Sequence, residues 1–160
     1  MKRIFIFPTI EEAKAFILTE PRDPVFVGGV GMAEIAAATL RAVKAKKPQL
    51  VVLAGIAAGD AGFAEPHPGF TADDRAGHAA DGTQRQTPEG NPENTSEGYL
   101  PEVENMEGAA FFAVCDALGV ACCQIRAVSN YVGEPFGQWA VEEAVGNLTE
   151  KLNQIFENNE

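Results

Sequence analysis

The stretch from Val103 to Val132 constrains the fold most, because it reads as a helix, a stop, a strand and a polar turn in direct succession. Between Met106 and Leu118 the apolar residues recur at helical spacing. Gly119 follows them, and glycine can adopt the left-handed conformation that ends a helix. Ala121–Val128 is a mostly apolar and β-prone run, which is typical of a strand covered on both faces. The stretch therefore predicts an α/β domain with a largely parallel sheet.

Polar side chains lie at both ends of this helix–strand unit. Ser129 and Asn130 follow the predicted strand at its carboxyl end, and Glu107 lies in the first turn of the predicted helix. Ligands of open α/β sheets bind outside the carboxyl ends of the strands, which makes all three candidates for a binding site. A purely structural role also stays open for Glu107, because the helix dipole stabilises a carboxylate in the first turn.

The rest of the chain alternates between β-prone runs and helical patterns. Strands are predicted at Lys2–Phe7, Val25–Val27 and Leu50–Ala54, and helices at Thr9–Leu18, Ala33–Lys46 and Gln138–Phe156. Glycine-rich turns are predicted after the second and third strands, at Gly28–Met32 and Gly55–Gly59. This pattern predicts a three-layer α/β/α domain in which four to five strands lie between helices.

Residues 63–102 break the pattern, because they are rich in Gly, Pro and polar side chains and show no period. We predict one domain over residues 1–160, in which this segment is long and irregular and holds no strand of the central sheet. Both histidines, His67 and His78, lie in it. Asp74 is four residues before His78, but no helical pattern presents the two on one face, so we expect neither a metal site nor a cofactor.

Charge and cysteine content narrow the class of protein. The net charge is −11, whereas a nucleic-acid-binding surface needs clustered basic residues. The same negative charge disfavours binding to anionic membranes. The apolar run Met1–Phe7 is too short for a signal peptide or a membrane helix, which predicts a cytoplasmic protein. The three cysteines are an odd number and include the adjacent pair Cys122 and Cys123, so we expect them to be reduced and structural.

Two motifs carry a resemblance to a known family. Glu104–Ala110 (Glu-Asn-Met-Glu-Gly-Ala-Ala), followed by Arg126–Val132 (Arg-Ala-Val-Ser-Asn-Tyr-Val), resembles the nucleoside phosphorylase and nucleosidase superfamily. The similarity is greatest to the futalosine hydrolases, a sister branch of the methylthioadenosine/S-adenosylhomocysteine nucleosidases. It covers roughly residues 1–60 and 103–157 and implies a phosphorylase/hydrolase-like fold. Full-length members have strands and a helix in the interval between, and the composition of residues 63–102 predicts that this chain lacks them.

The resemblance implies roles at the sugar and at the attacking water. Glu107 would hold the ribose hydroxyls, with Met106 packed against the sugar. Glu12 matches by spacing the acidic residue that helps to activate the water, although Thr9 and Glu12 also fit a capping box and the two roles can coexist. Gly31 belongs to a Gly-Val-Gly-Met turn that is similar to the family's turn beside the ribose. The alternative for this turn is a purely structural role as a tight strand-to-helix connection.

The resemblance also implies roles at the leaving base. Asn130 would form a hydrogen bond with the base, and Ser129 and Arg126 would support it. The adenine-releasing branches carry Asp at this position. An amide both donates and accepts a hydrogen bond, which suits a 6-oxo purine or a related base. Trp139 could stack on a base or simply anchor the last helix.

These expectations favour a hydrolase over a phosphorylase. Residues 27–39 and 50–62 contain no Arg or Lys, whereas phosphate sites normally combine backbone donors with such side chains. We predict a nucleosidase-like protein that binds a purine-type nucleoside and hydrolyses its N-glycosidic bond. The alternative is an inactive relative that binds a nucleoside or base, or serves as an oligomeric scaffold. Loss of middle strands would leave apolar surface or a free sheet edge, which predicts a homodimer.

Overall fold

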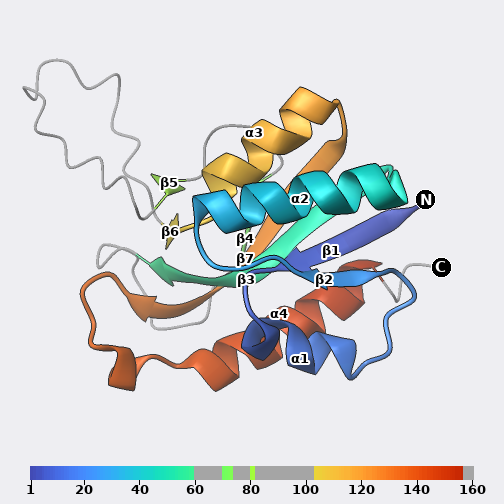
Figure 1. Ribbon diagram of the computed structural model, residues 1–160. Helices are drawn as coiled ribbons and strands as arrows, with labels where there is room; N and C mark the ends of the chain where they lie inside the picture. The colour runs from blue at the N-terminus through green and yellow to red at the C-terminus, as the bar shows by residue number, and fades with distance from the viewer. Residues whose placement is uncertain (60–69, 74–79, 82–102, 157–160) are drawn as a thin grey trace, which may run out of the picture.

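The computed structural model describes residues 1–59, 70–73, 80–81 and 103–156. These residues form a sheet with helices on both faces (Figure 1). Helices α2 (Met32–Lys46) and α3 (Gly108–Leu118) cover one face, and α1 (Ile10–Ile17) and α4 (Val141–Phe156) cover the other. The predicted three-layer α/β/α architecture is confirmed. Within the described ranges, no helix combines the length and the apolar character needed to cross a membrane.

The sheet is larger than the sequence predicts, with seven strands rather than four to five. The strands are β1 (Arg3–Phe7), β2 (Val25–Val27), β3 (Leu50–Gly59), β4 (Phe70–Asp73), β5 (Ala80–Asp81), β6 (Val103–Asn105) and β7 (Ala121–Tyr131). β1 pairs in parallel with β2 and β3, and β3 pairs in parallel with β7. β6 is antiparallel to β3 and parallel to β5, and β4 is antiparallel to β7. The sheet is therefore largely parallel, as predicted.

The expectation that residues 63–102 contain no strand of the sheet is wrong at two places. β4 pairs with β7 from Phe70 opposite Ala127 to Asp73 opposite Gln124, and β5 pairs with β6. Strands of four and two residues are too short to show a period in the sequence, and their pairing depends on β6 and β7, which follow much later in the chain. The other residues of this segment, with both histidines, lie outside the described ranges.

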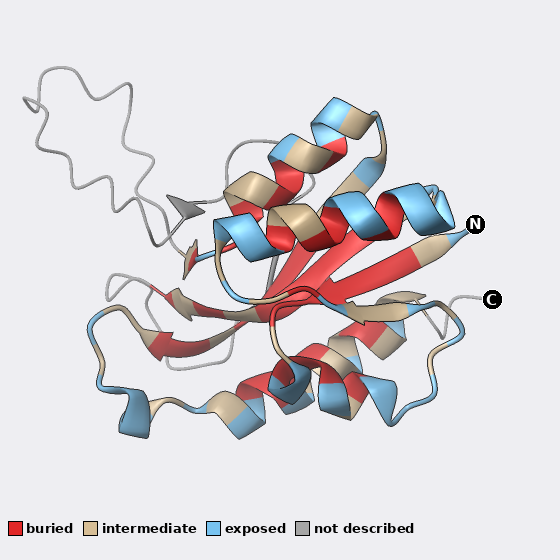
Figure 2. Cartoon of the chain, viewed as in Figure 1, coloured by how far each residue is buried: buried red, intermediate tan, exposed pale blue. Residues whose placement is uncertain are grey.

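The core has two halves, one on each face of the sheet (Figure 2). In β1, Phe5 and Phe7 pack in the half that includes α1 and α4 residues, whereas Ile4 and Ile6 pack in the half that includes α2 and α3 residues. All four side chains are fully buried. This double burial explains why the central strands read as continuous apolar runs rather than as alternating ones.

Some boundaries differ from the prediction because long strands pair beyond their apolar runs. β3 continues to Gly59, so the predicted turn Gly55–Gly59 is strand, with an irregularity in its pairing to β7 between Ala57 and Ala58. β7 continues to Tyr131 and takes in Ser129 and Asn130. The last helix begins at Val141 rather than at Gln138, after a 3-10 turn η2 (Phe136–Gln138).

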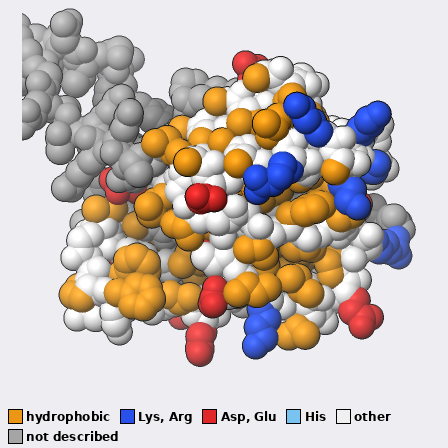
Figure 3. All heavy atoms as spheres, viewed as in Figure 1, with side chains coloured by type: hydrophobic (Ala, Val, Ile, Leu, Met, Phe, Trp, Pro, Cys, Tyr) orange, Lys and Arg blue, Asp and Glu red, His pale blue; other side chains and the backbone are white. Residues whose placement is uncertain are grey.

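Large apolar side chains remain exposed around the start of α2. Val27, Val30 and Met32 are each more than a third exposed. In Figure 3, hydrophobic side chains are spread over the face that α2 and α3 form, and lysines and arginines gather toward one side of it. Among the basic residues of α2, Lys44 and Lys46 lie in its last turn, where the helix dipole favours positive charge.

Candidate active site

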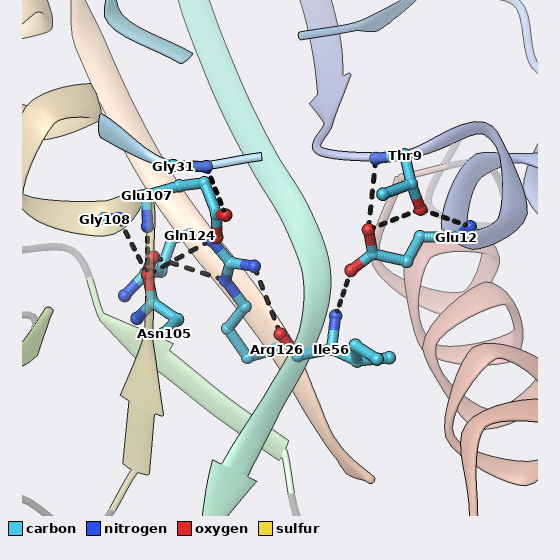
Figure 4. Close-up of polar contacts among 9 residues, drawn as sticks. All are labelled: Thr9, Glu12, Gly31, Ile56, Asn105, Glu107, Gly108, Gln124 and Arg126. Carbon is cyan, nitrogen blue, oxygen red and sulfur yellow. Dashed lines mark hydrogen bonds and ion pairs between the residues drawn. The ribbon is translucent and has the colours of Figure 1, made fainter. Parts of the chain in front are cut away.

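Two buried carboxylates come from helices on opposite faces of the sheet, and one arginine lies between them (Figure 4). Glu12 belongs to α1 and is 5% exposed, and Glu107 stands at the start of α3 and is 4% exposed. Arg126 of β7 is fully buried. Burying three charges is costly unless they are paired and hydrogen-bonded, and here they are.

Glu107 is the N-cap residue of α3, and two donors hold its carboxylate. Oε1 accepts a hydrogen bond from the backbone N–H of Gly31 at 3.0 Å, and Oε2 accepts one from Arg126 Nη2 at 3.2 Å. Gly31 is the N-cap of α2 and has a φ of 90°, which favours glycine at this position. The structure thus brings Gly31 and Glu107 together, as the resemblance implies for the two turns.

Glu12 both caps its helix and reaches into the sheet. Its backbone N–H donates to Thr9 Oγ1 at 3.2 Å, and its Oε2 accepts from the backbone N–H and the hydroxyl of Thr9 at 3.1 and 2.8 Å. The predicted capping box is therefore confirmed. Oε1 accepts from the N–H of Ile56 in β3 at 2.8 Å, which directs the carboxylate toward the sheet. Burial raises the pKa of Glu12, although these hydrogen bonds and the charge of Arg126 oppose the rise.

Arg126 connects the two carboxylates. Its Nη1 donates to the carbonyl oxygen of Ile56 at 3.2 Å, and the N–H of the same residue donates to Glu12, so the backbone of Ile56 bridges Arg126 and Glu12. Its Nε lies 3.5 Å from Gln124 Oε1. Burial lowers the pKa of Arg126, and the charges of Glu107 and Glu12 act against that effect. An arginine with such partners keeps its proton.

Arg126, which is predicted to support Asn130, makes its hydrogen bonds elsewhere. Its guanidinium donates to Glu107, Asn105, Gln124 and the carbonyl oxygen of Ile56. Four residues along a strand span about 13 Å, which separates Arg126 from Asn130 by more than the arginine side chain can bridge while it also binds Glu107.

Asn105 is a part of the site that the sequence reading did not single out. Its Oδ1 accepts from the backbone N–H groups of Glu107 at 3.1 Å and Gly108 at 2.7 Å, and from Arg126 Nη2 at 3.3 Å. Asn105 is buried, with 7% of its surface exposed. An asparagine just before a predicted helix is itself a capping signal that could have identified it.

Gly55 is the second residue that the sequence reading missed. A Cβ atom at this position would lie 2.6 Å from Arg126 Nη1 and 2.8 Å from Glu12 Oε1. Glycine is needed here because the two charged groups approach the backbone closely, not because a turn requires it. The sequence shows the glycine but not the groups that surround it.

Ser129 and Asn130 form a second polar group near the end of β7. Ser129 Oγ lies 2.8 Å from Asn130 Oδ1, and Asn130 Nδ2 donates to the carbonyl oxygen of Tyr131 at 3.0 Å. Both residues are buried. Ser129 therefore contacts the amide of Asn130, as predicted for a supporting residue, and the carbonyl oxygen of Tyr131, which can only accept, requires the amide nitrogen on its side.

Two apolar candidates lie at the surface. Met106 is 44% exposed beside the buried Glu107. Trp139 is half-buried, donates from Nε1 to the carbonyl oxygen of Glu134 at 2.9 Å, and packs at 5.0 Å between ring centroids against Phe136. These contacts hold Trp139 against the turn that precedes α4. Phe136, which the sequence reading did not select, is 75% exposed.

Comparison with known proteins shows the family of the chain. Residues 79–158 match the model of the Phosphorylase superfamily. Futalosine hydrolase of Thermus thermophilus is 41% identical over 54 residues, which are 33% of this chain and 24% of that protein. The matched stretch thus spans about a quarter of that relative's length.

Solved structures share the fold. The D198N mutant of Helicobacter pylori MTAN with 5′-methylthioadenosine in its active site has a TM-score of 0.74 at 16% identity, with 98% of each chain covered. A futalosine hydrolase mutant of Helicobacter pylori also has a TM-score of 0.74 at 16% identity, covering 98% of this chain and 99% of that one. Apo 5′-methylthioadenosine nucleosidase of Arabidopsis thaliana has 0.75 at 13% identity, covering 99% and 96%. From its two motifs, its fold and the family match, this chain belongs to the phosphorylase superfamily.

Proposed function

We propose that this protein is a nucleosidase that hydrolyses the N-glycosidic bond of a purine-type nucleoside, as a futalosine hydrolase-like enzyme. The observation that carries the proposal is the pair of buried carboxylates, Glu12 and Glu107, held around one buried arginine. Cleavage of this bond builds positive charge on the sugar and negative charge on the base. One carboxylate can stabilise the positive charge on the sugar, and the other can activate the attacking water.

Glu107 is suited to the ribose. A carboxylate offers about four lone-pair sites, and the described donors, Gly31 and Arg126, occupy two of them. The remaining sites can accept from ribose hydroxyls, and the negative charge favours the cationic sugar of the transition state. The exposed Met106 beside it offers an apolar surface to the sugar.

Glu12 is suited to activating the water. Burial raises the pKa of Glu12, which makes its carboxylate a stronger general base. Its capping bonds with Thr9 occupy Oε2, and Oε1 receives the N–H of Ile56. A second lone pair of Oε1 is the one we assign to the water.

Asn130 is suited to a leaving base that needs a hydrogen bond rather than a proton. Its amide cannot act as an acid, but it can both donate and accept. The contact with Ser129 orients it. We assign a 6-oxo purine or a related base to this position, and the similarity to a futalosine hydrolase supports that assignment. Trp139, with the exposed Phe136 against it, is our candidate for a stacking surface.

Hydrolysis is favoured over phosphorolysis by the placement of cations. The two glycine-rich segments, residues 27–39 and 50–62, carry no Arg or Lys. Arg126 does lie at the site, but Glu107, Asn105 and the carbonyl oxygen of Ile56 hold its guanidinium. A phosphate would have to compete with a buried carboxylate for it.

The test measures both binding and base release. Thermal shift and calorimetry with futalosine, inosine and 5′-methylthioadenosine identify a ligand, and chromatography then detects the free base with and without phosphate. We expect phosphate-independent release that falls by ~10²–10⁴-fold in Glu12→Gln. Glu11→Gln, an exposed glutamate in the same helical turn, is the matched control. Binding without release in the wild type would instead identify a non-catalytic nucleoside-binding protein.

We also propose that the protein forms a homodimer through apolar surface near the start of α2. Val27, Val30 and Met32 are exposed there, close in the chain to Gly31, which binds Glu107. β2, of three residues, ends one side of the strand order and pairs with β1 alone among the described strands. Exposed apolar side chains and a sheet edge are the features that a second copy would cover.

A further inference from the structure

We propose that Asn105 is the positioning residue of this site: its one neutral carbonyl oxygen holds both the backbone of Glu107 and the guanidinium of Arg126. The proposal rests on the proposed function for what the site does. The arrangement of hydrogen bonds that carries it does not depend on the reaction.

The sheet determines where this oxygen lies. Asn105 is the last residue of β6, and the pairing of Glu104 with Ala58 ties β6 to the end of β3. Asn105 itself pairs with Asp81 of β5. Its side chain therefore projects from the paired end of a strand rather than from a free loop, and it is buried. Side chains on such elements hold a site more accurately than loop side chains do.

Three donors converge on Asn105 Oδ1, although a carbonyl oxygen has two lone pairs. The N–H groups of Glu107 and Gly108 belong to the start of α3, where backbone donors lack partners within the helix. The third donor is Arg126 Nη2, which also donates to Glu107 Oε2. The same oxygen thus places the main chain of Glu107 and the cation that its carboxylate binds.

The neutrality of Asn105 matters in addition to its hydrogen bonds. Asn and Asp are about equally good at capping a helix start, so capping alone would not distinguish them. The site already holds two carboxylates, Glu12 and Glu107, against the single guanidinium of Arg126. A third carboxylate at position 105 would compete for that guanidinium and would add negative charge beside the other two.

The arrangement around Arg126 also affects the pKa of Glu12. In the present arrangement Arg126 donates to Glu107 directly and to the carbonyl oxygen of Ile56, whose own N–H donates to Glu12. Charge on Glu107 raises the pKa of Glu12, and charge on Arg126 lowers it. An aspartate at position 105 acts in the same direction as Glu107, so it raises the pKa of Glu12 further.

The experiment compares Asn105→Asp, Asn105→Ala and Asn147→Asp, the last on α4 as the control for one added charge. The probes are futalosine and inosine, with free-base release measured from pH 5 to 9. We expect Asn105→Asp to keep the thermal midpoint of the wild type but to move the acid limb of the kcat/KM profile upward by about one pH unit. Asn105→Ala should lower kcat/KM by about 100-fold, because Glu107 and Arg126 lose their common support.

A capping role alone predicts a different result. Asn105→Asp would then match the wild type in stability, in kcat/KM and in pH profile, and that outcome overturns the proposal. If Asn105→Asp does not fold, Asn105→Ser replaces it: a serine caps about as well but is too short to hold Arg126 as well. Wild-type activity in Asn105→Ser would equally overturn the proposal.

A second readout separates this proposal from the proposed function. The side-chain carboxyl carbon of Glu12, followed by NMR titration without ligand, should titrate at higher pH in Asn105→Asp than in the wild type or in Asn147→Asp. If no nucleoside is hydrolysed but this shift is present, the proposed function is wrong and the positioning role stands. If nucleosides are hydrolysed and the shift is absent, the positioning role is wrong.

Discussion

Gly55→Ala adds a single methyl group between the two charged halves of the site. The new Cβ would lie 2.6 Å from Arg126 Nη1 and 2.8 Å from Glu12 Oε1, whereas ordinary contacts begin at 3.4 Å. To reach ordinary contact, the guanidinium must therefore move away by about 0.8 Å and the carboxylate by about 0.6 Å. Gly55 does not have a positive φ, so its backbone accepts alanine and the effect comes from the methyl group alone.

The expected effects differ in size for stability and for turnover. Overpacking of this kind costs about 1–3 kcal/mol of unfolding free energy. A displacement of 1 Å at reacting groups can lower the rate by about 100-fold, so shifts of this size predict a loss of roughly 10- to 100-fold in kcat. Nucleoside affinity should change less, because Glu107 keeps its bond from the backbone of Gly31.

Urea unfolding, calorimetry and base release measure the three quantities on the same preparation. Gly146→Ala in α4 is the matched control, because a Cβ there meets no neighbour within 4 Å and alanine favours a helix. It should be as stable as the wild type or more so, with unchanged turnover. Wild-type kcat and stability in Gly55→Ala would refute the close approach of Arg126 and Glu12 around this residue.

Three further predictions test the site and the assembly. Glu107→Gln should weaken nucleoside binding modestly in calorimetry but lower hydrolysis by ~10²–10³-fold, because the cationic sugar exists only near the transition state; unchanged affinity would remove the ribose assignment. Because the raised pKa of Glu12 makes the folded state bind its proton more tightly, this group's contribution to stability should fall as pH rises above 4.5, while activity rises. Thermal midpoints and rates across pH should show these opposite trends, and Glu12→Gln should remove this component of both. Sedimentation at micromolar concentration should give a dimer, and a monomer would refute the assembly.

Much of this architecture depends on residues that are close together in the chain, and those parts could be predicted from the sequence. The capping box of Thr9 and Glu12 spans three residues, and its hydrogen bonds form as predicted. Gly119 ends α3 in the left-handed conformation, with a φ of 62°. The unbroken apolar run Ile4–Phe7 of β1 already indicates a strand covered on both faces. Local propensity and hydrophobic pattern decide these features, so the layered α/β fold follows from them.

The parts that only the tertiary structure decided involve residues far apart in the chain. Glu12 meets Ile56 across 44 positions, Arg126 meets Ile56 across 70, and Gly31 meets Glu107 across 76. The pairing of β4 with β7 and the crowding around Gly55 are of the same kind. The amino-acid sequence determines that Arg126 is a cation on a buried strand, but the order and register of the strands determine that it binds Glu107 rather than Asn130. Because Arg126 is buried, this pairing matters for stability: a charge removed from water is costly unless an opposite charge lies next to it.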